Sequence, residues 1–139
     1  MPAKDLYHDI VVVALAADGW KVTDDQLYLG YGDRDLWVDL GAERLPLTAE
    51  KQVERIAVEI KGFLNPSPVD DLQTAIGQFN MYRDVLAETE SDRFLYLAIT
   101  QRAWEGIFSE PLGQLMLERQ RLRLIVFDAK TERIIKWIS

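Results

Sequence analysis

The chain of 139 residues contains no cysteine and only one histidine, His8. Without cysteine, neither a disulfide framework nor a zinc or iron–sulfur site built on thiolates can form. A single histidine also argues against a zinc site made from imidazole ligands. The sequence therefore excludes the disulfide-rich proteins and the thiolate metalloproteins.

Long apolar segments are also missing. The longest apolar run covers residues 10–17, which is eight residues, whereas a helix needs about 20 residues to span a bilayer. No basic segment of the kind found in secretory signal peptides precedes that run. We therefore expect no membrane association and a cytoplasmic location.

Basic residues are fewer than acidic ones: the chain has 16 Lys and Arg but 23 Asp and Glu, which gives a net charge of −7. This sign opposes nucleic-acid binding by the chain as a whole, since phosphate contacts require cations. Arg119, Arg121 and Arg123 could still form one local basic patch while acidic residues face elsewhere. A basic partner protein could also supply the positive charge that DNA binding requires.

The composition is otherwise that of a globular protein, with 48% apolar and 28% charged residues. The length suits one domain, and no internal repeat, low-complexity stretch or linker divides the chain. We therefore expect a single domain covering residues 1–139.

Apolar periodicity predicts three helices and six strands. The helices are expected at residues 5–17, 69–87 and 103–119, and the strands at residues 20–29, 36–45, 55–63, 93–100, 122–127 and 134–138. This order predicts a mixed sheet with helices packed on it, in an α/β (mixed α+β) domain.

The first helix is the least certain of these elements, because the β-branched run Ile10–Val13 also suits a buried strand. If helical, residues 10–17 are apolar nearly all the way round. Such a helix needs cover on more than one side, which favours self-association into a homo-oligomer.

Residues 36–45 and 55–63 form a predicted β-hairpin, because the loop at 46–53 carries proline and several polar residues. In the second strand, side chains alternate between the two faces of the sheet. Glu59 and Lys61 therefore share one face, opposite to a face of isoleucine and valine. This places a carboxylate and an ammonium group side by side.

The register of the hairpin decides which acid faces Glu59, since facing residues of an antiparallel pair have a constant sum of residue numbers. Asp39 faces Glu59 if the hairpin is centred on residue 49, in the middle of its loop. Asp35 or Glu43 would face it with the centre at 47 or 51, so both remain possible if a bulge is present. We favour Asp39.

Directly opposed side chains have Cβ atoms about 4.5–5.5 Å apart, where two carboxylates repel each other unless a cation lies between them. Mg²⁺ prefers one or two carboxylates and keeps several waters, one of which can attack a phosphodiester. Asp39 and Glu59 are therefore candidate ligands of Mg²⁺ or Mn²⁺, and Lys61 would orient the water or neutralise developing phosphorane charge. Alternatively, Glu59 and Lys61 are only the polar side of an edge strand.

The segment Gln78-Phe-Asn-Met-Tyr82 lies in the helix predicted after this strand, and its spacing places Gln78 and Tyr82 on one helix face. An acid followed by Glu59-Ile60-Lys61 and then by Gln-x-x-x-Tyr resembles the PD-(D/E)XK nuclease superfamily, in its RecB-like and Holliday-resolvase-like branches. The resemblance implies a restriction-endonuclease-like core with a mixed central sheet and catalytic roles for Asp39, Glu59, Lys61, Gln78 and Tyr82. Alternatively, Tyr82 is a core residue beside a chance glutamine.

Those branches also place an acid on the first helix, where the nearest candidates in this chain are His8 and Asp9. This is a departure from the superfamily pattern. A lone histidine near a helix start is more often a surface or capping residue than a ligand. His8 and Asp35 therefore remain secondary candidates for the site.

Over nearly its full length the chain also resembles the XisH family, the fdxN-element excision controlling factors of cyanobacteria. The segments that carry this resemblance are Met1–Asp5, Arg34–Glu43, Ile56–Lys61 and Leu122–Asp128. The resemblance implies a role in excising a DNA element by site-specific recombination during heterocyst development. It also implies two partners, a separate recombinase and a small companion protein of the XisI family.

Three functional hypotheses follow. The chain is a Mg²⁺-dependent DNA endonuclease, a non-cleaving control factor that keeps the nuclease scaffold to bind a companion protein or DNA, or a toxin-like or immunity-like interaction protein. The net charge of −7 and the missing glutamate on the first helix motivate the second hypothesis. The expected acidic surface and the apolar first helix motivate the third.

Overall fold

The computed structural model of the chain describes residues 4–139. Its helices are α1 (His8–Ala17), α2 (Pro68–Thr89), α3 (Gln101–Glu105), the 3-10 turn η1 (Ile107–Ser109) and α4 (Pro111–Arg119). Its strands are β1 (Lys21–Asp24), β2 (Leu27–Tyr31), β3 (Arg34–Val38), β4 (Leu40–Arg44), β5 (Glu54–Ile60), β6 (Arg93–Thr100), β7 (Leu124–Asp128) and β8 (Arg133–Ile138).

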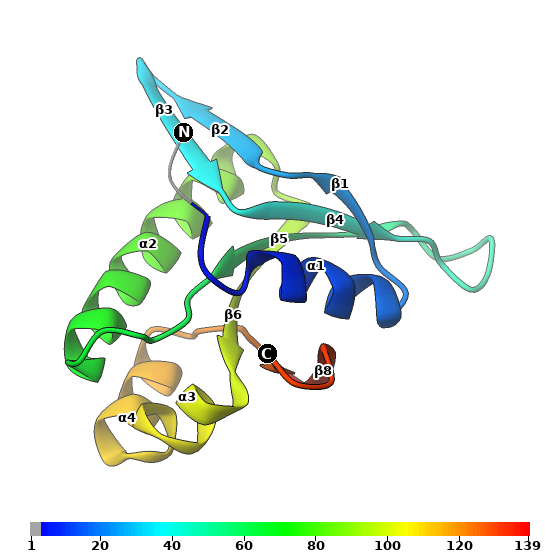
Figure 1. Cartoon of the computed structure of the whole chain (residues 1–139). Coiled ribbons are helices and arrows are strands. Elements are labelled where there is room, and N and C mark those ends of the chain that lie inside the picture. The colour runs from blue at the N-terminus through cyan, green and yellow to red at the C-terminus, as the bar shows by residue number, and fades with distance from the viewer. Residues whose placement is uncertain (1–3) are drawn as a thin grey trace.

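The central sheet has the strand order β1-β4-β5-β6-β7-β8. It is mostly antiparallel, because only the β5–β6 and β6–β7 pairings are parallel. Strand β6 lies in the middle and is almost continuously apolar, as expected for a strand covered on both faces. The prediction of a mixed α/β fold is confirmed (Figure 1).

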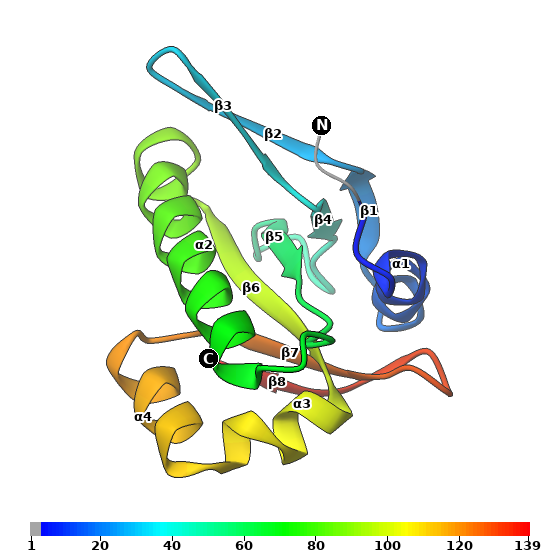
Figure 2. The same ribbon diagram turned by 60° about the vertical axis from the view of Figure 1, so that its left-hand side comes forward.

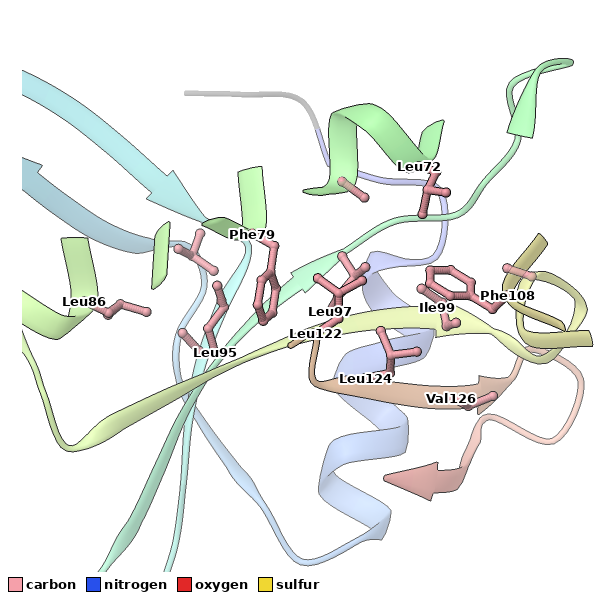
Figure 3. Close-up of a cluster of buried hydrophobic side chains, with 14 of the residues drawn as sticks. Leu72, Phe79, Leu86, Leu95, Leu97, Ile99, Phe108, Leu122, Leu124 and Val126 are labelled. Atoms are coloured by element: carbon pink, nitrogen blue, oxygen red, sulfur yellow. The ribbon is translucent and has the colours of Figure 1, made fainter. Parts of the chain in front are cut away.

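Helices cover both faces of this sheet. Figure 2 shows α2 on one side and α1 on the other. The α2 side buries a cluster that includes Leu72 and Phe79 of the helix and Leu97 of β6 (Figure 3). The α1 side buries a second cluster around Leu15 and Val58. Each buried side chain of this size contributes about 1.5–3 kcal/mol to stability, so the two clusters fix the sheet between its helices.

Helix α2 begins where the sequence predicts. The Ser67 side chain accepts a hydrogen bond from the N–H group of Asp70 at 3.3 Å, and Pro68 occupies the first helical position. Both features favour a helix start, because the first N–H groups of a helix lack partners within it. The buried residues Leu72, Ala75 and Phe79 then hold α2 against β6.

The alternative of a strand at Ile10–Val13 is wrong, because these residues lie inside α1. Cover is partial: Val11 and Leu15 are buried, whereas Val13 is exposed.

Residues 103–119 are not one helix either. They belong to α3, η1 and α4, and α4 packs against η1 through Gly113, where an added Cβ would lie 2.7 Å from the Cα of Phe108.

Two predicted strands are divided in the structure. Residues 36–45 split at Asp39, where the chain bends, so that β3 pairs with β2 in a separate hairpin and β4 pairs with β5 in the central sheet. Residues 20–29 split between β1 and β2 in the same way. Alternation alone could not show this, since it does not identify the partner of a strand.

Among residues 4–139, the structure contains no helix long and apolar enough to cross a bilayer.

Candidate functional site

Asp39 and Glu59 form a buried pair where β5 approaches its end. Leu40 pairs with Val58 and Gly41 with Ala57, and continuation of this register places Asp39 opposite Glu59, as the sequence predicts. The N–H group of Asp39 donates to Oε1 of Glu59 at 3.2 Å, and the N–H group of Ile60 donates to Oδ2 of Asp39 at 2.8 Å. The two residues are only 8% and 7% exposed.

This burial changes the acidity of both carboxyl groups. Burial raises the pKa of Glu59 to about 9, and the nearby charge of Asp39 adds to the effect. Burial also raises the pKa of Asp39, although hydrogen bonds from Ile60 and Glu59 oppose the rise. Near neutral pH the pair therefore holds one proton, carried by Glu59 and shared with Asp39, because two buried like charges in contact disfavour double ionisation.

Lys61 follows directly after β5. Its N–H group donates to the carbonyl oxygen of Ala98 at 2.9 Å, which continues the pairing of β5 with β6 by one residue. The positive charge of Lys61 lies near enough to Glu59 to lower the pKa of that carboxyl, against the larger effect of burial. The half-buried Lys61 is thus the cation of the site.

Helix α2 adds Tyr82 to the acid pair. Burial raises the pKa of Tyr82 to about 12, with further contributions from the charges of Glu59 and then Asp39. The phenol therefore remains a neutral hydrogen-bond donor at physiological pH. Gln78 lies one helical turn before Tyr82 and is half-buried, so the helix presents both side chains on one face.

The first helix contributes His8, which is 1% exposed. Its Nε2 lies 2.8 Å from Oδ1 of Asp25, just before the β2–β3 hairpin. The charge of His8 opposes the rise in the pKa of Asp39, so the ring lies near the acid pair. Its Nδ1 is buried without a hydrogen-bond partner among residues 4–139. Asp9, the other candidate on this helix, is exposed.

Asp5 is a neighbour of the site that the sequence did not predict. One carboxylate oxygen accepts from the N–H group of Tyr7 at 2.9 Å and the other accepts from that of Gly62 at 3.1 Å. A Cβ on Gly62 would lie 3.0 Å from the ring of Tyr7, so glycine permits this close approach. The charge of Asp5 raises the pKa of Asp39 further.

The other two acids considered for the hairpin lie elsewhere. Asp35 is in the exposed β2–β3 hairpin, where Oδ1 accepts from the hydroxyl of Tyr28 at 2.8 Å. Glu43 pairs with Arg55 across β4 and β5 at 3.0 Å. The structure therefore brings Asp39, and neither Asp35 nor Glu43, to Glu59.

The donor set suits a magnesium-type ion that keeps most of its waters. Two carboxylates are what Mg²⁺ prefers from a protein, and a cation in place of the shared proton would relieve the repulsion within the pair. In the part of the chain that the structure describes, no three His, Asp or Glu residues gather closely enough to enclose a metal ion. A fully protein-coordinated zinc site does not fit these residues.

The comparisons with known proteins agree with one another. The family model described as XisH protein matches residues 1–135. A crystal structure of an XisH family protein from Nostoc punctiforme is similar at 33% identity and a TM-score of 0.88, over 97% of this chain and 100% of that one. A crystal structure of an fdxN element excision controlling factor protein from Anabaena variabilis is similar at 34% identity and a TM-score of 0.86, over 98% of this chain and 100% of that one. No curated protein matches significantly. The chain therefore belongs to the XisH family.

Proposed function

We propose that this chain is a controlling factor for excision of a DNA element, built on a PD-(D/E)XK-type core with a Mg²⁺-dependent site for phosphodiester hydrolysis. The family supports the first part, since a solved relative is described as an fdxN element excision controlling factor. The second part rests on one observation, the buried Asp39–Glu59 pair beside Lys61. Burying two acids in contact is unfavourable unless a proton or a cation compensates for their repulsion.

Each residue of the site has a distinct part in such a reaction. A bound Mg²⁺ or Mn²⁺ would polarise the phosphate and acidify a water molecule. Asp39 and Glu59 would hold the ion, which would require Glu59 in its ionised form. Lys61 stabilises the negative charge that develops on the phosphate. Tyr82, neutral at physiological pH, and Gln78 orient the attacking water or the phosphate through hydrogen bonds.

The test is cleavage of supercoiled plasmid DNA by the full chain with millimolar Mg²⁺ or Mn²⁺. We expect cleavage that falls about 100-fold or more in Lys61→Ala, because the loss of one charge-stabilising group typically costs that much. Asp35→Asn is the matched control, since that acid lies outside the site, and it should cleave as the unmodified chain does. A chain that never cleaves with either metal ion would refute the nuclease part.

A second candidate is a non-cleaving control factor that works through an XisI-like companion protein and a recombinase. Two observations favour it, the net charge of −7 and the absence of a glutamate from the first helix, which begins with His8 and Asp9. Excision of a marked element by cells carrying Glu59→Gln decides between the two candidates. Normal excision supports the control factor, whereas lost excision by a folded variant supports the nuclease. We also propose that the chain contacts DNA, directly or through its partners, and that it forms a homo-oligomer.

A further inference from the structure

The edge of the sheet away from the acid pair contains a cavity of about 720 Å³. Its lining comes from the residues where β5 and β6 start and where β4 and β8 end, whereas Glu59 lies near the other end of β5. Figure 1 shows the course of β4 and β5. Its apolar lining comes from Trp20, Val53, Ile56, Phe94, Tyr96 and Trp137. A cavity of this size and lining is typical of a binding site.

The aromatic wall of the cavity is fixed by contacts within the chain. The ring of Trp137 lies 5.7 Å from that of Trp20 and 5.1 Å from that of Tyr96. Its indole N–H group donates to Oδ2 of Asp18 at 3.0 Å, and the guanidinium of Arg44 lies 4.5 Å from the Trp20 ring. The wall is therefore in place before an occupant arrives, which reduces the entropic cost of binding.

The charged side chains around the cavity are paired with one another. Arg44 contacts Glu54 at 3.2 Å, and Arg55 contacts Glu43 at 3.0 Å and Asp92 at 3.5 Å. An occupant of the cavity itself therefore needs no charge. An apolar side chain fits best, because it removes the exposed aromatic surface from water.

Exposed apolar residues surround the cavity mouth. Phe94 is 53% exposed and Val53 is 40% exposed, and both line the cavity. The loop that joins β4 to β5 also carries Leu47, which is 98% exposed. Large apolar side chains gathered in this way around a preformed cavity are typical of protein–protein interfaces.

Arg121 and Arg123 line a neighbouring cavity together, and Arg123 also contacts Phe94. The guanidinium of Arg123 lies 4.9 Å from the Phe94 ring. In residues 4–139, no carboxylate lies within 4.0 Å of Arg123 or Arg121 as an ion pair. Both charges lie near Arg83, whose pKa is lowered first by burial and then by Arg121, with a smaller contribution from Arg123 and opposition from Asp84. Clustered cations of this kind attract an anionic group from outside.

We propose that this edge docks a partner protein through a segment that places an apolar side chain in the aromatic cavity and a carboxylate on Arg123 and Arg121. Aromatic and arginine side chains are the residues that dominate binding energy at such interfaces. The arginines that line the cavity, Arg44 and Arg55, are paired with carboxylates, so among the residues that the structure describes a nucleic-acid backbone finds no free cation there. Because the surface lies at the far edge of the sheet, docking there does not cover the site around Asp39 and Glu59. The inference is independent of whether the chain cleaves DNA.

The test uses the indole N–H signals of the full chain labelled with ¹⁵N at tryptophan. The probe is the peptide acetyl-Trp-Asp-Asp-amide at millimolar concentration. We expect the signals of Trp20 and Trp137 to move, while those of Trp37 and Trp104, which lie outside the cavity lining, stay in place. The matched peptide acetyl-Trp-Lys-Lys-amide should bind about two- to five-fold more weakly, as the loss of an exposed ion pair implies.

Two variants complete the test. Arg123→Gln should remove the preference for the acidic peptide, and Phe94→Ala should weaken both peptides. Phe94 is exposed at the cavity mouth and Arg123 is half-buried beside it. The dispersion of the indole signals reports directly whether each variant is folded. Unmoved Trp20 and Trp137 signals, equal binding of the two peptides, or the same signals moving instead with a ten-nucleotide thymidine strand would each overturn the proposal.

Discussion

At the scale of single residues, Glu59 has the least ordinary environment in the site. Its carboxyl is buried, it faces Asp39, and its pKa is raised to about 9. A carboxyl whose pKa is higher in the folded than in the unfolded chain binds its proton more tightly when folded. Glu59 therefore makes stability depend on pH in a predictable direction.

The prediction concerns Glu59→Gln, which mimics the protonated carboxyl. Below the unfolded pKa of about 4.5 the acid is protonated in both states and the substitution changes little. As pH rises from there to about 9, the free energy of unfolding of the unmodified chain falls, because the folded chain keeps a proton on Glu59 that the unfolded chain releases. In metal-free urea unfolding at pH 9, Glu59→Gln should be more stable by on the order of a few kcal/mol.

The control for that experiment is Glu88→Gln, which removes one negative charge from the exposed surface of α2. It measures the effect of net charge alone. A Glu59→Gln variant whose stability relative to the unmodified chain is the same at pH 5 and pH 9 would show that Glu59 is not held protonated by the fold.

At the scale of elements, the packing of α4 on η1 divides the segment predicted as one helix. The segment 103–119 has helical periodicity, but periodicity does not show where a tertiary contact interrupts it. Gly113 sits where an added Cβ would meet the backbone of Phe108. A Cβ added to Gly77, on α2, would meet no atom within 4 Å. The two glycines therefore form a matched pair.

Gly113→Ala should destabilise the chain by about 1–3 kcal/mol, because the added methyl group forces α4 away from η1. Gly77→Ala should instead stabilise it by up to about 1 kcal/mol, since alanine has the higher helix propensity and meets nothing. Thermal unfolding of the two variants side by side checks this. Equal shifts of the two melting temperatures would contradict the packing described for α4.

At the scale of the whole molecule, the sequence predicts the part of the site that lies within one hairpin. Alternation places the side chains of Glu59 and Ile60 on opposite faces of the sheet. The length of the loop between β4 and β5 sets the register in which Asp39 faces Glu59. Both follow from local pattern, because a strand has a fixed side-chain period.

The rest of the site depends on contacts between distant segments. Asp5 reaches Gly62 and His8 reaches Asp25 only after α1 has packed against the sheet. No local periodicity marks such contacts. The division of residues 36–45 at Asp39 has the same origin, because β3 and β4 find different partners in the folded chain.

We propose that Asp39 and Glu59 form a divalent-cation site that exchanges its shared proton for the metal ion. Isothermal calorimetry of Mn²⁺ binding near pH 7.5, in buffers of different ionisation enthalpy, measures both the affinity and the protons released. We expect binding with release of about one proton per ion, and loss of both in Glu59→Gln but not in Asp35→Asn. Absence of binding, or binding that releases no proton and persists in Glu59→Gln, would contradict it.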